Sequence, residues 1–345
     1  MSSGIRVCPD CAADLEPVRR RDFLKAAGAV ALAGGTLPAW VRAEQAAPKS
    51  DETLVAQLYS SLTDAQKKEI CYDWDYMDAQ RGLLRTRVAN NWHINDVVIN
   101  SDFYTSEQKV LIREVFESII QPDWHAKIDQ QLQDDAGGYG EEQNVAIFGK
   151  PGDGKFQLVM TGRHMTLRCD GNSTEHVALG GPIFYGHAAK GFNEAADHPG
   201  NVFWPQAVMA NQLFGMLDGR QQKLALVDEL PKEEAVAFRG ASGGFPGIPI
   251  PELSSDQREH VQKVLQKLLE PYRQIDRDEV AACLKAQGGL EQCALSFYKA
   301  GDIGNDGVWD CWRLEGPAFV WYFRGSPHVH VWVNIADDPS VKLNA

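Results

Sequence analysis

The chain is short of positive charge and of long apolar runs. It has 34 Lys and Arg residues against 47 Asp and Glu, and a formal net charge of -13. A surface of this sign repels phosphate backbones and anionic lipid, so nucleic acid is not an expected partner. The N-terminal apolar run, Ala26 to Ala39, is too short for a membrane-spanning helix of ~20 residues, and it has no cysteine to accept a lipid. We therefore expect no stable membrane anchor.

Cysteine is also sparse, and its placement excludes some chemistry. No cysteine has a histidine neighbour in the sequence, so nucleophilic hydrolysis has no positive support. Cys8 and Cys11 lie upstream of the apolar run and would leave with a cleaved leader. Among the others, Cys283 and Cys293 flank a Gly-Gly turn at a spacing that is compatible with either a disulfide or two free thiols.

The N-terminus carries the most specific motif of the chain. Arg20-Arg21-Asp22-Phe23-Leu24-Lys25 is the core of a twin-arginine signal, and Val41-Arg42-Ala43 follows the apolar run as a cleavage site. The alternative, an amphipathic cytoplasmic helix, does not explain this order of residues. We predict a signal peptide over residues 1–43, a linker over 44–50, and a periplasmic or secreted product. The expected partners are the twin-arginine translocase and a signal peptidase.

Three segments share the features of a helix start. Thr63, Thr105 and Ser254 each stand three residues before a glutamine, and apolar residues at helical spacing follow. This arrangement is a capping box, in which two side chains satisfy backbone amides at the helix N-terminus. We interpret the recurrence as shared capping chemistry rather than as a repeat. A further helix is predicted from Gln206 to about Glu229.

Two blocks of aromatic and β-branched residues predict strands. The first runs from Asn144 to Phe148 and, after a turn, from Phe156 to Cys169. The second comprises Val308 to Gly316, Pro317 to Phe323 and His328 to Ile335. Strands that are far apart and flanked by helices predict one α+β domain, residues 51–345, with a mixed or antiparallel sheet in which the two blocks meet. The glycine- and proline-rich run Arg239 to Pro251 predicts a surface loop between them.

The second block contains a histidine pattern that suits a metal site. In a strand, His328, His330, Trp332 and Asn334 project from one face, because strand side chains alternate. Two imidazoles on one face can hold one ion, and imidazole suits copper, iron or zinc. Two histidines satisfied by ordinary neighbours would show the same pattern.

His164 is the candidate third ligand. It lies in Thr161-Gly162-Arg163-His164-Met165-Thr166, in the other strand block, and the glycine allows close approach of a ligand or backbone. A catalytic metal commonly has three protein ligands and an open position. Arg163 is the residue that we expect to orient an anionic group of a small-molecule substrate. Alternatively, both residues belong to a buried hydrogen-bond network.

Other polar residues are candidates for completing the site. His187, in Gly186-His187, is compatible with a fourth ligand or a general base, and Glu315 with a carboxylate ligand or an acid/base group. The alternative for Glu315 is an ion pair with Arg313 or Arg324. His198 and Glu194 are compatible with a supporting pair, although His198 more simply caps a turn.

These motifs together resemble a known family. The run Thr161 to Thr166, Gly181-Pro182-Ile183-Phe184, Leu314-Glu315-Gly316-Pro317 and His328-Val329-His330 are similar to the bacterial family named domain of unknown function 3500. The resemblance extends from Leu62 over nearly the whole remaining chain. It implies a histidine pair where this sequence has Arg163-His164, so only His164 carries over. It implies no particular reaction.

We therefore expect a metal site built from His164, His328 and His330, with His187 or Glu315 completing it. The expected function is a periplasmic metal-dependent enzyme, an oxidoreductase or a hydrolase, whose transition metal activates substrate, water or oxygen. Two other functions fit the same residues: a non-catalytic periplasmic protein that binds a small molecule or metal, and a structural or accessory protein with packed histidines.

Overall fold

Strand pairing arranges the chain around one open, mixed sheet. The structure, a computed structural model, describes residues 51–171, 173–188, 198–300, 302, 308–341 and 343. The strands lie in the order β1-β4-β5-β6-β7-β13-β12-β11-β10-β8, and β9 pairs with β10. β1 is parallel to β4 and β8 is parallel to β10, while the other neighbours are antiparallel. The α+β class and the common sheet that the sequence predicts are confirmed.

The strands of the sheet are β1 (Cys71–Tyr72), β4 (Gln143–Gly149), β5 (Phe156–Gly162), β6 (Met165–Cys169), β7 (Ile183–His187), β8 (Leu226–Val227), β9 (Ile248–Pro249), β10 (Ala294–Tyr298), β11 (Cys311–Gly316), β12 (Phe319–Arg324) and β13 (Val329–Ile335). A small hairpin, β2 (Met77–Asp78) and β3 (Gly82–Leu83), lies apart from it. The helices are α2 (Asp51–Ser61), α3 (Asp64–Ile70), α4 (Ser106–Ile119), α5 (Pro122–Ala136), α6 (Trp204–Met216), α7 (Gly219–Ala225), α8 (Ser255–Leu269) and α9 (Gln274–Ala286).

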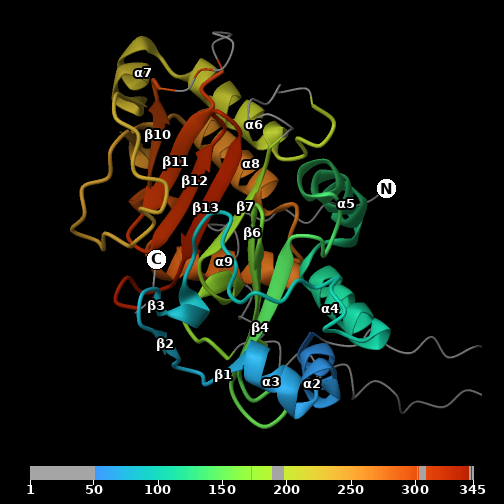
Figure 1. Cartoon of the computed structure of the whole chain (residues 1–345). Coiled ribbons are helices and arrows are strands. Elements are labelled where there is room, and N and C mark those ends of the chain that lie inside the picture. Colours follow the sequence, from blue (N-terminus) through green and yellow to red (C-terminus); the bar gives the residue numbers. More distant parts are fainter. Residues whose placement is uncertain are drawn as a thin grey trace, which may run out of the picture.

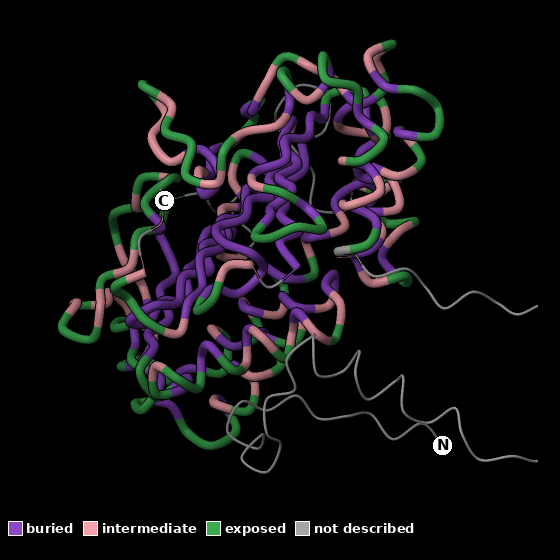
Figure 2. Tube along the Cα trace, turned by 90° about the horizontal axis from the view of Figure 1, so that it is seen from below, coloured by how far each residue is buried: buried purple, intermediate pink, exposed green. Residues whose placement is uncertain are grey.

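The two faces of the sheet have different covers. Leu158 and Met160 of β5 join the main core, which also contains buried residues of the helices, such as Ile112 and Leu265. Val159, between them, packs on the opposite face with Trp92, from the segment that precedes α4. Helices thus cover one face, and extended loops cover the other (Figure 1). The long strands β4–β7 and β10–β13 are buried along almost their whole length, and exposed residues concentrate at the periphery (Figure 2).

The two halves of the chain repeat one arrangement. Two helices and a short strand come first, then two helices and four strands, in both residues 51–188 and residues 204–335. In space, β7 pairs with β13 at the centre, and the order outward from that pair is the same on each side. In Figure 1, α2, α3 and α4 of the first half lie at the lower right, and α6, α7 and β10 of the second half lie at the top and upper left.

The repetition extends to the register of the strands. Cys71 pairs with Ile147 in the first half, and Leu226 pairs with Phe297 in the second. The Ile99 amide donates to the carbonyl of Gln143 at 2.9 Å, and the Ile250 amide donates to that of Cys293 at the same distance. Corresponding residues are about 150 positions apart throughout.

The capping boxes occupy equivalent positions, so our interpretation of them as mere shared chemistry is wrong. The predicted boxes at Thr63, Thr105 and Ser254 are confirmed, and the sequence pattern missed a fourth at Asp218. Their glutamines pair across helices. Gln66 and Gln108 exchange amide hydrogen bonds, as do Gln221 and Gln257. Such matched tertiary contacts indicate a repeated arrangement, because capping alone fixes only local geometry.

Three local predictions need correction. The helix expected from Gln206 to Glu229 is divided into α6 and α7, because Asp218 caps a new helix. The strand expected from Phe156 to Cys169 is divided at Arg163-His164, which form the turn between β5 and β6. Cys283 and Cys293 are buried free thiols, so the disulfide that the sequence allows is not formed.

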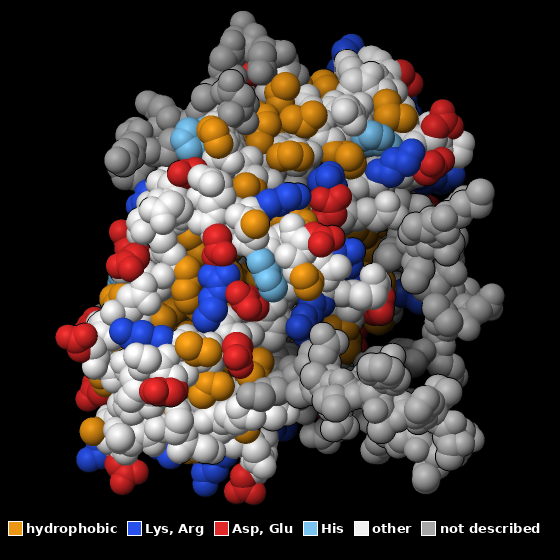
Figure 3. Space-filling view, turned by 90° about the vertical axis from the view of Figure 1, so that its right-hand side faces the viewer, with side chains coloured by type: hydrophobic (Ala, Val, Ile, Leu, Met, Phe, Trp, Pro, Cys, Tyr) orange, Lys and Arg blue, Asp and Glu red, His pale blue; other side chains and the backbone are white. Residues whose placement is uncertain are grey.

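Two surface properties follow from the described residues. None of the helices there combines the length and the hydropathy that crossing a membrane requires. On the face shown in Figure 3, basic and acidic side chains are interspersed. The predicted signal peptide and linker, residues 1–50, lie outside the described residues.

Replacing either glutamine of an equivalent pair should destabilise the fold to a similar extent. Gln66→Ala removes a helix cap and leaves the side chain of Gln108 without one of its partners, which should lower the free energy of unfolding by about 2–4 kcal/mol. Gln221→Ala should cost a similar amount, since its contacts are the same. Urea denaturation measures both. The exposed Gln130→Ala is the control, and it should change stability by less than about 0.5 kcal/mol. A loss of similar size in the control would contradict the role of the pairs.

Candidate metal centre

Three imidazoles meet beside the central strand pair, where β7 ends and β13 begins. The Nε2 atom of His330 lies 3.1 Å from Nε2 of His164 and 2.9 Å from Nε2 of His328. These three residues form a group in which one ligand atom from each lies within 4.8 Å of the others. Metal–nitrogen bonds of about 2.0–2.1 Å at tetrahedral angles place ligand nitrogens roughly 3.3 Å apart. The spacing of the three nitrogens is therefore close to that of a shared ion.

A tight turn presents His164 to the centre. Its φ of 48° is left-handed, which is uncommon for a residue with a side chain and is found at functional sites. The amide of His164 donates to Oδ1 of Asn91 at 2.8 Å, which helps to hold the turn. Gly186 of β7 provides the space, because a Cβ there would lie 3.0 Å from Cδ2 of His164. Sequence reasoning placed His164 on a strand, and the turn is what directs its ring toward β13.

The other two histidines come from the start of β13. His330 pairs with Gly186 of β7, and His328 immediately precedes the strand. As strand alternation predicts, both rings lie on the same side, with their centroids 4.6 Å apart. All three histidines are nearly buried, with exposed fractions of 2%, 6% and 3% for His164, His328 and His330.

Hydrogen bonding among the rings does not account for this geometry well. A neutral imidazole has one lone pair, and it lies in the ring plane. With the proton of His330 on Nδ1, where Glu233 accepts it, Nε2 would have to accept from both other Nε2 atoms at once or face a second lone pair. A single cation at the shared centre would satisfy all three nitrogens. The donor set alone, three imidazoles, is one that suits copper, iron or zinc.

A carboxylate holds the remote nitrogen of His164. Nδ1 of His164 is hydrogen-bonded to Oδ2 of Asp135, near the end of α5. The Nε atom of Arg163 donates to Oδ1 of the same carboxylate at 2.9 Å. A carboxylate at Nδ1 keeps the proton there, which leaves the Nε2 lone pair facing the centre. Arg163 thus fixes Asp135, which in turn orients His164.

A second carboxylate does the same for His330. Oε2 of Glu233 lies 2.8 Å from Nδ1 of His330, and its other oxygen pairs with Arg324. Nη2 of Arg324 also lies 2.8 Å from that Nδ1. Two of the three imidazoles are therefore fixed in a carboxylate–histidine arrangement that is typical of metal ligands.

The charges around the centre support neutral ligands and ionised carboxylates. Burial lowers the pKa of His330 to about 3, so its ring is neutral and able to bind a metal at pH 7. Although burial alone would raise them, the pKa values of Asp135 and Glu233 are lowered by hydrogen bonds from His164 and His330 and by the two arginines. The ionised carboxylates offset part of the positive charge that a bound cation would bring.

His187 lies beside the centre but on the other face of the sheet. It pairs with Val329, whereas His330 pairs with the preceding Gly186, so strand alternation turns the two imidazoles to opposite sides. The ring of His187 is 5.4 Å from that of His198, centroid to centroid. Burial lowers the pKa of His187 to about 4. It is not part of the three-histidine group.

Glu315 lies in a separate ion-pair cluster. It is in β11, two strands from β13, and is opposite Val320 of β12. Its Oε1 atom accepts from Arg313 at 2.7 Å and from Arg239 at 2.9 Å. The structure thus places Glu315 in the ion pair with Arg313 that was the alternative prediction. It does not bring Glu315 into the histidine group.

One further candidate from the sequence has a definite place. His198 Nδ1 accepts from the Gly200 amide at 3.1 Å, as a turn-capping residue would, while Glu194 lies outside the described residues.

The sequence also contains a serine motif that our argument against nucleophilic hydrolysis overlooked. Gly240-Ala241-Ser242-Gly243-Gly244 matches the pattern of a hydrolase nucleophile elbow. Ser242 is exposed in a loop, whereas the elbow requires a strand-to-helix turn.

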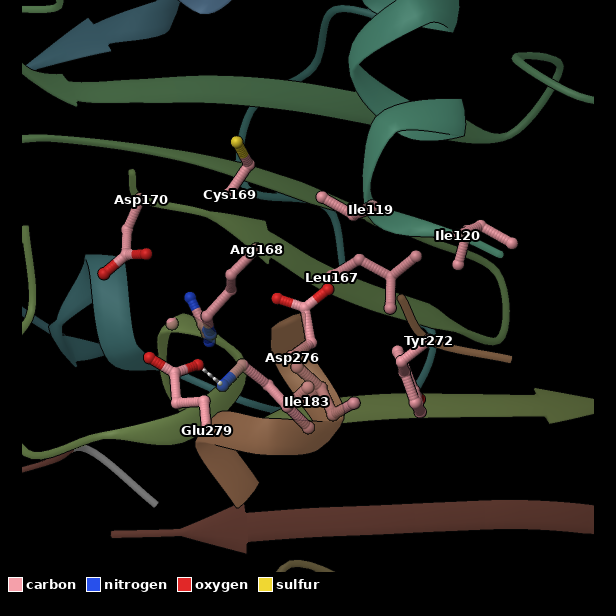
Figure 4. A pocket seen from close by; sticks show the side chains of 12 residues that line it. Ile119, Ile120, Leu167, Arg168, Cys169, Asp170, Ile183, Tyr272, Asp276 and Glu279 are labelled. Carbon is pink, nitrogen blue, oxygen red and sulfur yellow. Dashed lines mark hydrogen bonds between the residues drawn. The ribbon is translucent and has the colours of Figure 1, made fainter. Parts of the chain in front are cut away.

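A different polar cavity lies between β6, β7 and α9 (Figure 4). Arg168 in its wall is buried, and its guanidinium donates to the carbonyls of Pro182, Arg85 and Arg87. Glu279 accepts from the amide of Leu179 at 3.1 Å. These contacts tie loops to the sheet, and the cavity lacks the convergent imidazoles of the centre.

Comparison with known proteins identifies the family. The family model described as "Protein of unknown function (DUF3500)" matches residues 46–334. The chain belongs to this family. No curated protein and no solved structure matches the DUF3500 chain.

Sequence reasoning found the three histidines and missed the groups that orient them. Asp135 follows an ordinary helical pattern, and Glu233 lies in an acidic stretch before the glycine-rich loop. Neither has a local signal, because each reaches its histidine only through tertiary packing. The sequence does contain one signal for the centre itself. Gly186 lies in a strand, and a glycine there marks a place where another group, in this case the ring of His164, approaches the backbone closely.

Weakening either carboxylate should reduce metal affinity. Asp135→Asn and Glu233→Gln keep the shape of the side chains but remove the charge that orients each imidazole, so the affinity for zinc or copper should fall about 10- to 100-fold. Competition with a chromophoric chelator measures this. The control is Asp129→Asn, which alters an ion pair between α5 and Arg113 of α4 and contacts none of the three histidines. Equal affinities in all three variants would contradict the proposed support.

Proposed function

We propose that this DUF3500 protein is an exported metal-dependent enzyme that binds one transition metal through His164, His328 and His330. The observation that carries the proposal is the convergence of three buried Nε2 atoms, two of them on imidazoles whose Nδ1 atoms are held by carboxylates. Three protein ligands leave a coordination position for an exogenous ligand. Copper or iron would supply oxidation–reduction chemistry, and zinc would supply hydrolytic chemistry.

The surroundings of the centre restrict what it can act on. The three ligands are almost inaccessible to solvent, so a ligand that reaches the metal must be small. Arg163 and Arg324 lie behind the carboxylates, where they fix Asp135 and Glu233. We therefore assign Arg163 to positioning rather than to substrate, which revises the role that the sequence suggested. Oxidoreduction of a small molecule is the reaction class that we favour.

The proposal includes export by the twin-arginine route. Its support is the sequence Arg20-Arg21-Asp22-Phe23-Leu24-Lys25 and the apolar run that follows. That route carries folded proteins, so a metal bound between distant strands can be acquired before the protein crosses the membrane. The periplasm is the expected site of action.

Metal content tests the centre directly. The protein recovered from the periplasmic fraction should contain about one transition metal per chain, and His164→Ala and His328→Ala should each lower this content at least 10-fold, because each removes one of three ligands. Elemental analysis measures it, with circular dichroism to confirm folding. His176→Ala, which changes an exposed histidine paired with Asp337, is the matched control. Full occupancy in folded His164→Ala would rule out the centre, and absence from the periplasm would rule out the export.

A second function, metal binding without turnover, is favoured by one observation. The near-complete burial of the three ligands is what a closed structural or storage site would show. Azide distinguishes the two functions, because it is a small anion that binds an open position on copper. If the enzyme proposal is right, azide should change the visible absorption of the copper-loaded protein in a saturable manner. A spectrum that does not respond to azide would favour the closed site. Loss of the copper spectrum in His330→Ala is the control that assigns it to this centre.

A further inference from the structure

We propose that the chain is a fused pair of equivalent units, and that the histidine centre occupies one of two equivalent positions at their junction. The first unit comprises residues 51–188, and the second residues 204–338. The role of the histidines rests on the proposed function, but the relation between the units does not. The inference explains both where the centre lies and why the described part of the chain has one such histidine group.

The junction itself defines a twofold axis. Ile183 of β7 is paired with Val333 of β13, and these two residues also correspond to each other in the two units. An antiparallel pair of corresponding residues can occur only where a twofold axis passes between them. The same relation maps the pairing of Tyr185 with Met165 onto that of Ile335 with Phe319. The register of the inner strands is therefore that of a symmetric dimer.

A second contact, distant in sequence, lies on the same axis. The connection between α4 and α5 meets the connection between α8 and α9, where the Gln121 amide donates to the carbonyl of Pro271 at 2.8 Å. Ile120 and Tyr272 form a bridge beside it. Gln121 and Pro271 again correspond in the two units. Both the sheet and the helix layer are thus joined through equivalent residues, as in an isologous interface.

The histidine centre uses both units. His164 comes from the turn between β5 and β6 of the first unit, while His328 and His330 lie at the start of the last strand of the second. The backbone contact beside the turn is repeated in each unit, since the Gly186 amide donates to the carbonyl of His164 and the Ala336 amide to that of Ala318. Ala318 is therefore the equivalent of His164.

The equivalent position is filled by apolar side chains. Ala336 corresponds to Gly186 and forms a bridge with Val177, just as Gly186 pairs with His330, so Val177 takes the place of His330. Val177, Ala318 and Ala336 form a small apolar cluster there, against which Phe238, Val341 and Leu343 pack. Small side chains have replaced imidazoles, and the C-terminal residues cover the place where a second ion would lie.

A twofold relation between the units predicts how far apart the two natural ends of the chain lie. The axis superimposes Ala188 on Asp338 and the start of α6 on the start of α2, so the distance from Ala188 to α6 should equal that from Asp338 back to α2. Two units in the reverse order, with Ala345 joined directly to Glu44, should therefore have a connection of similar length. The axis predicts that the natural ends can be joined without displacing either unit.

Two circular permutants with this join test the inference. One opens the chain between Ala188 and His198, and so reverses the units. The other opens it inside the first unit at Gly152-Asp153, in the exposed turn between β4 and β5. We expect each to fold with an unchanged circular dichroism spectrum and a melting temperature within about 4 °C of the parent mature chain. Metal content should stay at the parent value in both.

The outcomes separate the two proposals. Folding of either permutant shows that the ends can be joined as the axis requires, and failure of both to fold would overturn the fused pair. In another outcome, the parent binds metal while the unit-reversing permutant folds but binds none. The pairing of the two units would then not be sufficient for the centre, and this result would overturn the assignment of the centre to the junction between the units. If neither the parent nor the folded permutants bind metal, the proposed function fails while the fused pair stands.

Discussion

The antiparallel pairing of β7 with β13 is the constraint on which the centre depends. It brings Gly186 opposite His330, so the glycine leaves room for the ring of His164 directly beside the imidazoles of the last strand. A register shift of one residue would put His187 opposite His330 and turn the histidine strand to the other face. The five paired positions between these strands therefore fix both the sheet and the geometry of the three nitrogens.

Rigidity around the ligands comes from charge rather than from packing alone. Asp135 and Glu233 each contact an imidazole on one side and an arginine on the other. The carboxylate of Asp135 is buried, and without a cationic partner it would carry a large desolvation cost, which Arg163 offsets. Glu233 is partly exposed, so Arg324 mainly fixes its position there. The arrangement is the same at His164 and His330, although the residues come from unrelated segments.

The fold could be predicted from the sequence to the extent that it is local. Capping boxes and strand blocks are patterns of neighbouring residues, so the helix starts at Thr63, Thr105 and Ser254 could be predicted from the sequence. The three histidines could be predicted as candidate ligands too, because the chemistry of imidazole is evident from residue type. The turn at Arg163-His164, the carboxylates and the pairing of Gln66 with Gln108 were not, because each is decided by segments tens of residues away. The repeat was obscured for the same reason: the two halves share contacts more than they share residues.

The division of the ligands between the halves has a consequence for synthesis. His164 leaves the ribosome well before His328 and His330, which are among the last residues of the chain. A product that stops short of the final strand therefore lacks two of three donors, however well its first half is folded. Capture of an ion at this place would then report that the last strand has been made and inserted, so a chain that stops before this strand would stay empty.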